Sequence, residues 1–326
     1  DGRLAVIGGR NIGDTYFGAD EGNRISVDAD MMLVGSKVTE VSAVFDSFWN
    51  LGLSLPIVAL WPAFKVNRGA FRRRLARHVQ SPQSRRFLAQ TMAERPAGTF
   101  LTGRLRWTDK VQLLADPPDK AYGQRTAPWV STAITGILSS ARREVRLITP
   151  YFVPGETGAA SLTALAARGV KVSLLTNALS ATDLILVFGA YRHYRAPLLA
   201  AGISIHEYSG LTRPGDKRNV LHSKVFIVDG QQAVVGSLNF DLRSAFSNTE
   251  LGLLFEEPEL VADLTRMFDA ATAPEQSYLV SGNEGALQWA VQRPGLPAVM
   301  SVEPEASWNR RVLSWMVGCL PIQSFL

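Results

Sequence analysis

The chain has 326 residues, enough to bury one large core or two ordinary ones, and 46% hydrophobic with 19% charged residues excludes a disordered chain. A single cysteine, Cys319, excludes an internal disulfide framework, and no apolar run approaches the roughly 20 residues of a membrane-spanning helix. The net charge of +5 is uneven, because residues 51–108 contain eleven Lys or Arg and one acid.

The first predicted element is a short strand that ends in a glycine turn, within DGRLAVIGGRN at residues 1–11. The same spacing returns without a gap in DGQQAVVGSLN at residues 229–239. A strand is predicted at residues 28–34 and a helix at residues 38–49. The chain begins with Asp instead of Met, so we expect the natural N-terminus to lie upstream.

A basic helix is predicted in the segment KVNRGAFRRRLARH, residues 65–78. Phe71, Leu75 and Val79 recur at helical spacing while four arginines fall elsewhere, which is typical of an amphipathic helix. Two interpretations stay open. The arginines form a solvated helix face, or they attract an anionic surface of lipid headgroups or nucleic acid.

A second unit begins near Val111, where strand and helix patterns alternate. This alternation predicts a largely parallel sheet covered by helices, with a site beyond the carboxyl ends of the strands. The predicted helices are residues 128–141, 161–168 and 182–201. The polar segments at the strand ends are residues 149–152, residues 176–180 with Asp183, and residues 206–207.

The clearest pattern is LHSKVFIVDGQQAVVGSLN, residues 221–239. His222 and Lys224 alternate along a predicted strand and therefore share one face. The Asp-Gly pair that starts at Asp229 predicts a hairpin, whose second strand returns Ser237 and Asn239 beside them.

These residue types suit the chemistry of a phosphodiester. Histidine can act as nucleophile or as acid and base near neutral pH, and lysine supplies a positive charge beside it. Serine and asparagine add neutral hydrogen bonds while a fifth oxygen ligand forms at phosphorus. Such exchange requires two histidines, one to attack and one to protonate the leaving group. Two motif copies that face each other across a pseudo-twofold axis would provide both.

The pattern HxK(x)4D(x)6GSxN resembles the signature of the phospholipase D superfamily, and residues 222–239 match every position. The first copy matches at Asp1, Gly8, Gly9 in the serine position, and Asn11. Its His and Lys would stand seven and five residues ahead of Asp1, so we expect a fragment that is inactive alone. The segments TPYFVP, TNALSATD and DPPDK are similar to the bacterial cardiolipin synthase branch.

The resemblance implies an α/β fold with two pseudo-symmetric halves, mostly parallel sheets covered by helices in an α-β-α-β-α sandwich, and an incomplete first half. Residues 1–108 would be the remainder of the first half, with a basic helical segment at residues 51–105. Residues 109–326 would be the second half with an amphipathic tail. The implied activity is phosphatidyl transfer through a phosphohistidine, with the first-copy histidine usually the nucleophile and no metal or cofactor.

The resemblance also implies site residues. An acid after each motif orients a histidine in the family; Glu250 is the candidate in the second copy, and Asp30 in the first is equally a strand-edge acid. The implied catalytic residues are His222, Lys224, Asp229, Ser237, Asn239, Glu250, Asp1 and Asn11. The implied substrate-binding residues are Gly8, Gly9, Gly236, Tyr151 and Asn177.

The expected partners are phospholipids, namely phosphatidylglycerol as acceptor and phosphatidylethanolamine as a further substrate, and an anionic membrane surface. The implied location is the cytoplasmic face of the bacterial inner membrane, bound peripherally, without nucleic acid. A C-terminal helix is predicted with Trp308, Val312, Trp315, Met316 and Cys319 on one face. That face lies at a membrane interface or docks on the core.

Three rival functions stay open: a hydrolase with water as acceptor, a nuclease of the same superfamily, and a lipid-binding module without activity. The remaining histidines do not separate them. His78 is expected in solvent, His193 in a surface or packing role, and His206 either along the cleft or away from it. The oligomeric state is left open.

Overall fold

A ten-stranded mixed sheet forms the centre of the molecule. The computed structural model describes residues 2–20, 24–60, 67–82, 84–85, 88–89, 105–123, 129–211, 217–283, 285–323 and 326. Across the sheet the order is β16 (Val299–Met300), β15 (Gln288–Ala290), β14 (Ser277–Ser281), β8 (Ser204–Tyr208), β7 (Lys171–Asn177), β5 (Glu144–Ile148), β10 (Val225–Val228), β11 (Gln232–Gly236), β13 (Leu251–Phe255) and β4 (Val111–Ala115). Three strand pairs stand outside it: β1 (Leu4–Gly8) with β3 (Asp30–Val34), β2 (Ser26–Val27) with β9 (Val220–Leu221), and β6 (Phe152–Val153) with β12 (Phe240–Asp241).

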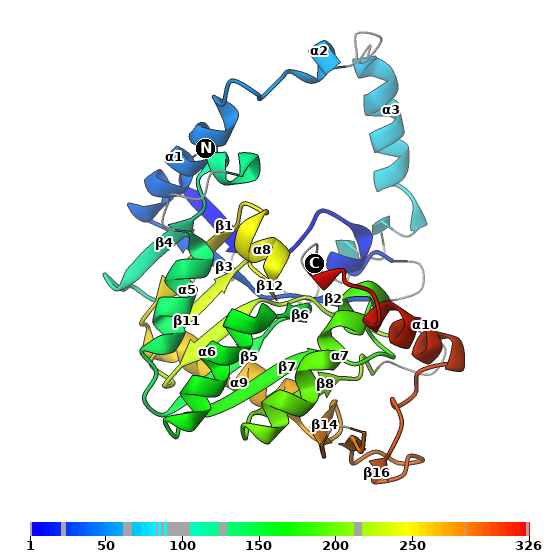
Figure 1. Ribbon diagram of the computed structural model, residues 1–326. Coiled ribbons are helices and arrows are strands. Elements are labelled where there is room, and N and C mark those ends of the chain that lie inside the picture. Colours follow the sequence, from blue (N-terminus) through cyan, green and yellow to red (C-terminus); the bar gives the residue numbers. More distant parts are fainter. Residues whose placement is uncertain are drawn as a thin grey trace.

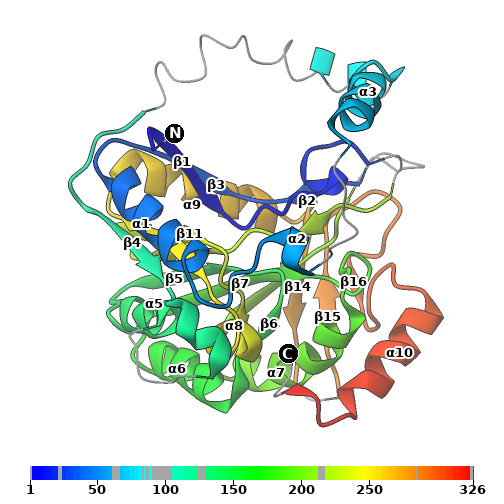
Figure 2. The ribbon, with the colours of Figure 1, turned by 90° about the horizontal axis from the view of Figure 1, so that it is seen from above.

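Helices cover both faces of this sheet (Figures 1 and 2). One face carries α5 (Val130–Ser139), α6 (Gly155–Ala167) and α7 (Ile185–Ala200), and α10 (Trp308–Gly318) packs on α7. The other face carries α9 (Pro258–Thr272) together with the β1–β3 pair and α1 (Lys37–Trp49). The remaining helices are α2 (Ile57–Leu60), α3 (Arg68–Val79), α8 (Leu242–Phe246) and the 3₁₀ turns η1 (Asp14–Tyr16) and η2 (Pro118–Tyr122).

Strand β10 shows why the sheet lies in the middle. Its four residues are apolar and buried, and successive side chains point to opposite faces. Val225 and Ile227 join the core beneath α9, whereas Phe226 and Val228 join the core beneath α5 and α6. A strand without a polar face needs cover on both sides, which the two helical layers supply.

The sequence predicted the α/β class correctly, but the sheet is mixed instead of mostly parallel. Only the pairings β5–β7 and β7–β8 are parallel among the nine of the described sheet. The chain reverses at the hairpin β10–β11 and again at β14–β15, and the strands beside these pairs are also antiparallel. Every strand of the large sheet comes from residues 111–300; the division at residue 108 stays a prediction.

The first motif copy rests on the second. Strands β1 and β3 are antiparallel, and Ile7 and Leu33 share a core with Val235 and Leu253 of the large sheet. This contact places the turn after β1 near the end of β11, where the second motif turns. The two glycine turns therefore belong to one region of the molecule.

Two helices leave apolar side chains uncovered. In α3, which stands away from the body in Figure 1, Phe71, Leu75 and Val79 are exposed. In α10, Val317 packs against α7 while Trp315 is exposed. The C-terminal helix thus docks on the core, but through Ser314 and Val317 and not through the predicted face, whose Trp308, Trp315 and Met316 are exposed. Among the described residues, no helix is both long and apolar enough to cross a bilayer.

Candidate active site

A pair of short parallel strands brings the two motif regions together. Strand β2 pairs with β9 so that Val27 lies opposite Leu221, and the backbone N–H of His222 donates to the carbonyl of Val27 at 2.7 Å. The next residue after Val27 is Asp28, whose Oδ2 lies 2.7 Å from Nδ1 of His222. An acid that follows the first motif copy therefore holds the imidazole of the second copy.

This contact sets the proton on the ring. A carboxylate only accepts hydrogen bonds, so Nδ1 of His222 donates to Asp28, and in the neutral ring the lone pair lies on Nε2. The rings of Tyr16 and Tyr151 meet the imidazole edge-on, with centroids at 5.0 Å and 6.2 Å. The imidazole is thereby oriented for attack or for proton transfer at Nε2.

Lys224 places its ammonium beside the same ring. Its Nζ lies 2.9 Å from Nδ1 and 3.1 Å from Nε2 of His222 and donates to the carbonyl of His222 at 2.5 Å. Burial lowers the pKa of Lys224 to about 8, although the carboxylates of Asp28 and Glu250 act in the opposite direction. A phosphate oxygen on a phosphorus atom near Nε2 would lie within reach of this charge.

A chain of buried polar groups stands behind the second glycine turn. Ser237 Oγ donates to Glu250 Oε2 at 2.5 Å and accepts from the N–H of Leu251 at 3.0 Å. The N–H of Glu250 donates to Asp116 Oδ2, which also accepts from Lys120 Nζ at 2.6 Å. Burial raises the pKa of Glu250 above its usual value, despite the hydrogen bond from Ser237.

The buried pair Asp116–Lys120 belongs to the DPPDK segment and orders the surrounding loop. Lys120 Nζ also donates to the carbonyl of Ser244 at 2.9 Å, and Ser244 Oγ accepts from the N–H of Asn239 at 3.3 Å. Asp241 accepts from the N–H of Ser244 at 2.7 Å and caps α8. The sequence pointed to this segment by resemblance, without a role for its charged residues.

The strand register identifies which acids are equivalent. Gly8 lies opposite Asp30 in the pair β1–β3, and the equivalent glycine of the second motif lies opposite Gly252 in the pair β11–β13. Two positions before these partners stand Asp28 in the first copy and Glu250 in the second. Asp28 is therefore the counterpart of Glu250.

Asp30, the candidate that the sequence offered, takes a different role. Its Oδ2 pairs with Nε of Arg10 at 2.5 Å, and Arg10 also donates to the backbone carbonyls of Tyr16 and Asp28. These contacts fasten the GGRN turn to β3. Two acids at alternate positions of one strand share a face, so the sequence could not tell them apart without the register.

Comparison with known proteins shows what the chain is similar to. A family model described as "Cardiolipin synthase, PLD-like domain" matches residues 134–272. Cardiolipin synthase C of Escherichia coli (strain K12) is 29% identical over 344 residues, covering 100% of this chain and 71% of the relative. A cardiolipin synthase of Geobacillus thermodenitrificans is 30% identical, covering 77% of this chain and 40% of the relative.

The chain is thus similar to the cardiolipin synthase branch of the phospholipase D superfamily. The fold agrees with this placement. The crystal structure of a phosphatidylserine synthase of Haemophilus influenzae Rd KW20 superimposes with a TM-score of 0.55, at 13% identity, over 85% of this chain and 61% of the other. At that identity the likeness concerns the fold alone.

Within the phospholipase D motif, Asp229 lies at the far end of β10 from His222. It has a φ of 56° and, with Gly230, forms the predicted turn. Its carboxylate accepts from the N–H groups of Arg142, Arg143 and Glu144 at 3.0, 2.7 and 2.9 Å. Partial burial raises its pKa, but these donors outweigh burial and hold it below its usual range. The structure therefore assigns Asp229 to the hairpin and not to the reacting groups.

The glycines of the two motif copies allow neighbouring backbone segments to approach each other closely. A Cβ at Gly8 would lie 2.7 Å from the carbonyl of Ala29, and one at Gly236 would lie 2.3 Å from the carbonyl of Leu251. A Cβ at Gly9 would lie 2.8 Å from Cδ of Lys224, so the first turn passes directly over that side chain.

The other predicted site residues lie in different parts of the molecule. Tyr151 contacts the imidazole ring and donates to Asp183 at 3.0 Å, whereas Asn11 donates to the hydroxyl of Tyr16, whose ring contacts the imidazole. Asn177 is buried and bonds to the N–H and carbonyl of Leu221 at 2.9 Å, which supports the strand before His222. Asp1 lies outside the described residues.

Three further observations concern the predicted strand and the remaining histidines. The predicted strand through His222 and Lys224 begins at Val225, so both residues stand in an irregular segment before β10. His206 packs against Phe268 of α9, away from His222, and burial lowers its pKa. His193 bonds to the carbonyl of Gly318 and joins α7 to α10.

Proposed function

We propose that the protein is a phosphatidyltransferase that makes cardiolipin from phosphatidylglycerol through a phosphohistidine intermediate. The single observation that carries this proposal is the cluster at His222. Its imidazole is held at Nδ1 by Asp28 of the first half and lies beside the ammonium of Lys224. The matching family model and the cardiolipin synthase names of the relatives support the same reaction.

The reaction proceeds in two balanced steps. One imidazole attacks phosphorus, a P–N bond forms, the P–O bond to the headgroup breaks, and the second imidazole protonates the departing alcohol. The hydroxyl of phosphatidylglycerol then gives its proton to that second imidazole and attacks phosphorus, and the P–N bond breaks. Both steps need an imidazole from each motif copy, so His222 supplies one of them.

The two acids have equivalent roles in this scheme. Asp28 lies in the first half and orients His222 of the second half. Glu250, its counterpart by register, lies in the second half and would orient the imidazole of the first motif. Lys224 and Asn239 would hold the nonbridging oxygens of the phosphodiester, while Ser237 keeps Glu250 in place.

We also propose that the protein binds the surface of an anionic membrane, at the cytoplasmic face of the bacterial inner membrane, and that phosphatidylethanolamine serves as a further substrate. Helix α3 presents Phe71, Leu75 and Val79 to solvent beside its arginines, as interfacial helices do. Trp308 and Trp315 of α10 are also exposed. Both helices can bind lipid headgroups without spanning the bilayer.

The test compares two extended forms of the chain. One carries a strand with His and Lys seven and five residues ahead of Asp1, and the matched control carries Ala at both positions. We expect the His-x-Lys form to convert phosphatidylglycerol to cardiolipin at least about 10³-fold faster than the control and than residues 1–326 alone. Thin-layer chromatography and mass spectrometry of the products measure the conversion.

The products also distinguish the rival functions. Phosphatidic acid as the main product in the presence of excess phosphatidylglycerol would mean that water is the acceptor. Equal activity in the His-x-Lys form and its alanine control would contradict the two-histidine mechanism. His222→Ala in the His-x-Lys form should abolish transfer while circular dichroism and the unfolding transition stay unchanged.

A further inference from the structure

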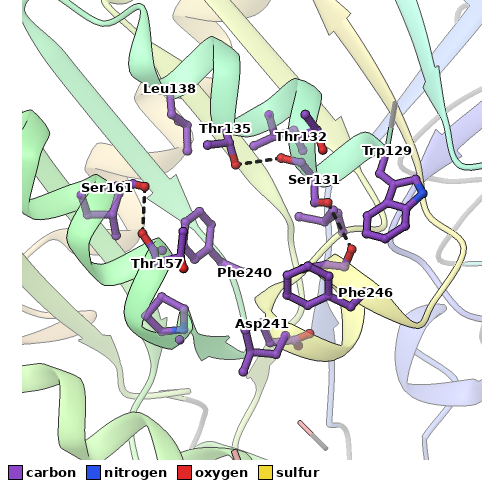
Figure 3. A pocket seen from close by; sticks show the side chains of 18 of the residues that line it. Trp129, Ser131, Thr132, Thr135, Leu138, Thr157, Ser161, Phe240, Asp241 and Phe246 are labelled. Atoms are coloured by element: carbon purple, nitrogen blue, oxygen red, sulfur yellow. Dashed lines mark hydrogen bonds between the residues drawn. The ribbon is translucent and has the colours of Figure 1, made fainter. Parts of the chain in front are cut away.

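A groove of about 710 Å³ runs between α5 and α6, on the sheet face opposite α9 (Figure 3). Its floor consists of Ile134 and Leu138 of α5, Leu162 and Leu165 of α6, and Phe240. Ligand pockets typically have volumes of about 300–1,000 Å³, so the groove is large enough for an extended organic group. Nothing in the reaction at His222 requires this space.

The walls of the groove contain hydroxyl groups, yet they demand no polar ligand. Thr135 donates to the carbonyl of Ser131 at 2.8 Å, and Ser161 donates to the carbonyl of Thr157 at 2.8 Å (Figure 3). Ser131 in turn donates to the carbonyl of Ala245 at 3.2 Å. Because these donors are satisfied within the protein, the groove presents carbon surface and suits an apolar occupant.

One end of the groove opens at the second motif. Asn239 and Asp241, within four residues of Ser237, belong to its lining. Asn239 Oδ1 is buried and has no hydrogen-bond partner among the described residues. The two charged residues of the lining, Asp241 and Glu156 in the first turn of α6, lie at this end. The other end reaches Ser139, at the last residue of α5.

The length of the groove matches one leaflet of a bilayer. Helix α5 has ten residues and so spans roughly 15 Å. The hydrocarbon core of a bilayer is about 30 Å thick, so one fatty-acyl chain reaches about 15 Å. A hydrocarbon chain that leaves a phosphodiester at the motif would therefore fit along the whole groove.

We propose that this groove binds one fatty-acyl chain of the phosphatidyl group whose phosphorus reacts at His222. This inference rests on the proposed function, which supplies a phospholipid at the motif. The polar end faces the phosphodiester and the glycerol backbone, and the apolar walls of α5 and α6 receive the chain. The groove would then select for diacyl phosphodiesters over water-soluble ones and hold the phosphatidyl group while the acceptor enters.

The experiment uses lysophosphatidylglycerols of 6, 8, 10 and 12 carbons below their critical micelle concentrations, and glycerophosphoglycerol as the chain-free probe. Isothermal titration calorimetry with the full 326-residue chain measures the dissociation constants. We expect affinity to rise up to about fourfold per methylene, following the transfer free energy of a buried CH₂. The probes bind without turnover, so residues 1–326 suffice.

Variants that block the groove test whether this gain in affinity arises from binding in the groove. Thr135→Phe and Ser161→Phe fill the groove from its two walls and should flatten the chain-length dependence, leaving glycerophosphoglycerol binding unchanged. Thr135→Asp places a charge there and should have the same effect without added bulk. Thr163→Phe is the matched control, because Thr163 is exposed on α6 outside the groove lining, and it should keep the dependence. Thermal unfolding verifies the fold of each variant.

Two results would overturn the proposal: no chain-length dependence in the wild type, or a dependence that persists in folded Thr135→Phe, Ser161→Phe and Thr135→Asp. If a blocking variant changes the oligomeric state, and affinity for the probes does not depend on chain length, the groove binds a second copy of the chain and the proposal is wrong. Failure of the proposed function looks different. The His-x-Lys form would then make no cardiolipin, whatever the chain-length dependence of binding.

Discussion

The two motif copies have the same local pattern but different support. The GSLN turn ends a strand of the large sheet and stands on the Asp116–Lys120 pair, whose side chains are fully buried. The GGRN turn ends a strand of a two-stranded sheet and is fastened by the partly exposed Arg10–Asp30 pair. The imidazole at the second copy nevertheless depends on Asp28, which belongs to the first copy. The second copy thus has the more buried support, whereas the first copy supplies the acid that orients the histidine of the second.

The largest expected effect concerns this dependence across the copies. Asp28→Asn in the His-x-Lys form should lower kcat about 10²- to 10⁴-fold, because an amide can donate to Nδ1 of His222 and so select the wrong tautomer. Steady-state rates of cardiolipin formation measure the loss. The neighbouring Asp30→Asn is the matched control, since Asp30 contacts Arg10 and not the imidazole. Equal losses in both variants would contradict the assignment from the strand register.

The next prediction concerns the two ion pairs. Lys120→Met leaves the buried carboxylate of Asp116 without its partner and should lower the free energy of unfolding by about 3–5 kcal/mol. Arg10→Met breaks a partly exposed pair and should cost at most about 1 kcal/mol. Urea unfolding followed by circular dichroism measures both. Similar losses would mean that the two turns are supported equally.

The ammonium at Lys224 gives a prediction on pH. Burial holds the pKa of Lys224 at about 8, below its usual 10.5, so kcat/KM of the His-x-Lys form should fall as pH rises through about 8. The unfolded chain binds this proton more tightly than the folded one. The contribution of Lys224 to the free energy of unfolding therefore rises from about pH 8 to about 10.5.

These opposite trends separate loss of charge from loss of fold. Above pH 8, pH–rate profiles should decline while urea unfolding of Lys224→Met, compared with the unsubstituted protein, reveals the stabilising contribution. The difference in unfolding free energy between the two proteins should change across this range in favour of the unsubstituted protein. If activity and that difference decline together, local unfolding and not the charge of Lys224 explains the profile.

Much of the second copy could be predicted from the sequence, because its information is local. The Asp-Gly turn at Asp229 and the strand that follows it come from turn chemistry and strand period, whereas His222 and Lys224 meet in an irregular segment before β10. The role of Asp229 could not be predicted, since its three backbone partners come from residues 142–144. The predicted α/β class was correct, but the largely parallel sheet was not.

The first copy was harder to predict because its contacts are distant in the sequence. Asp28 reaches His222 through a pairing between strands separated by almost two hundred residues, and no local pattern records it. The buried pair Asp116–Lys120 is also remote from the loop that it supports. Likewise, the groove depends on how α5 and α6 lie against each other, which hydrophobic periodicity does not specify.

The smallest expected effect concerns Gly9, which stands where the second copy has Ser237. Gly9→Ser would restore the family pattern, yet its Cβ would lie 2.8 Å from Cδ of Lys224 and 3.0 Å from Oδ1 of Asp28. The Lys224 side chain can shift, so we expect a loss of about 1 kcal/mol, or about fivefold in kcat/KM of the His-x-Lys form. Gly13→Ser is the control, since its Cβ would meet Tyr16 at an ordinary 3.5 Å. A gain of activity in Gly9→Ser would mean that the two turns need the same residue, whereas a loss confined to Gly9 would show that the first turn has adapted to the lysine of the second.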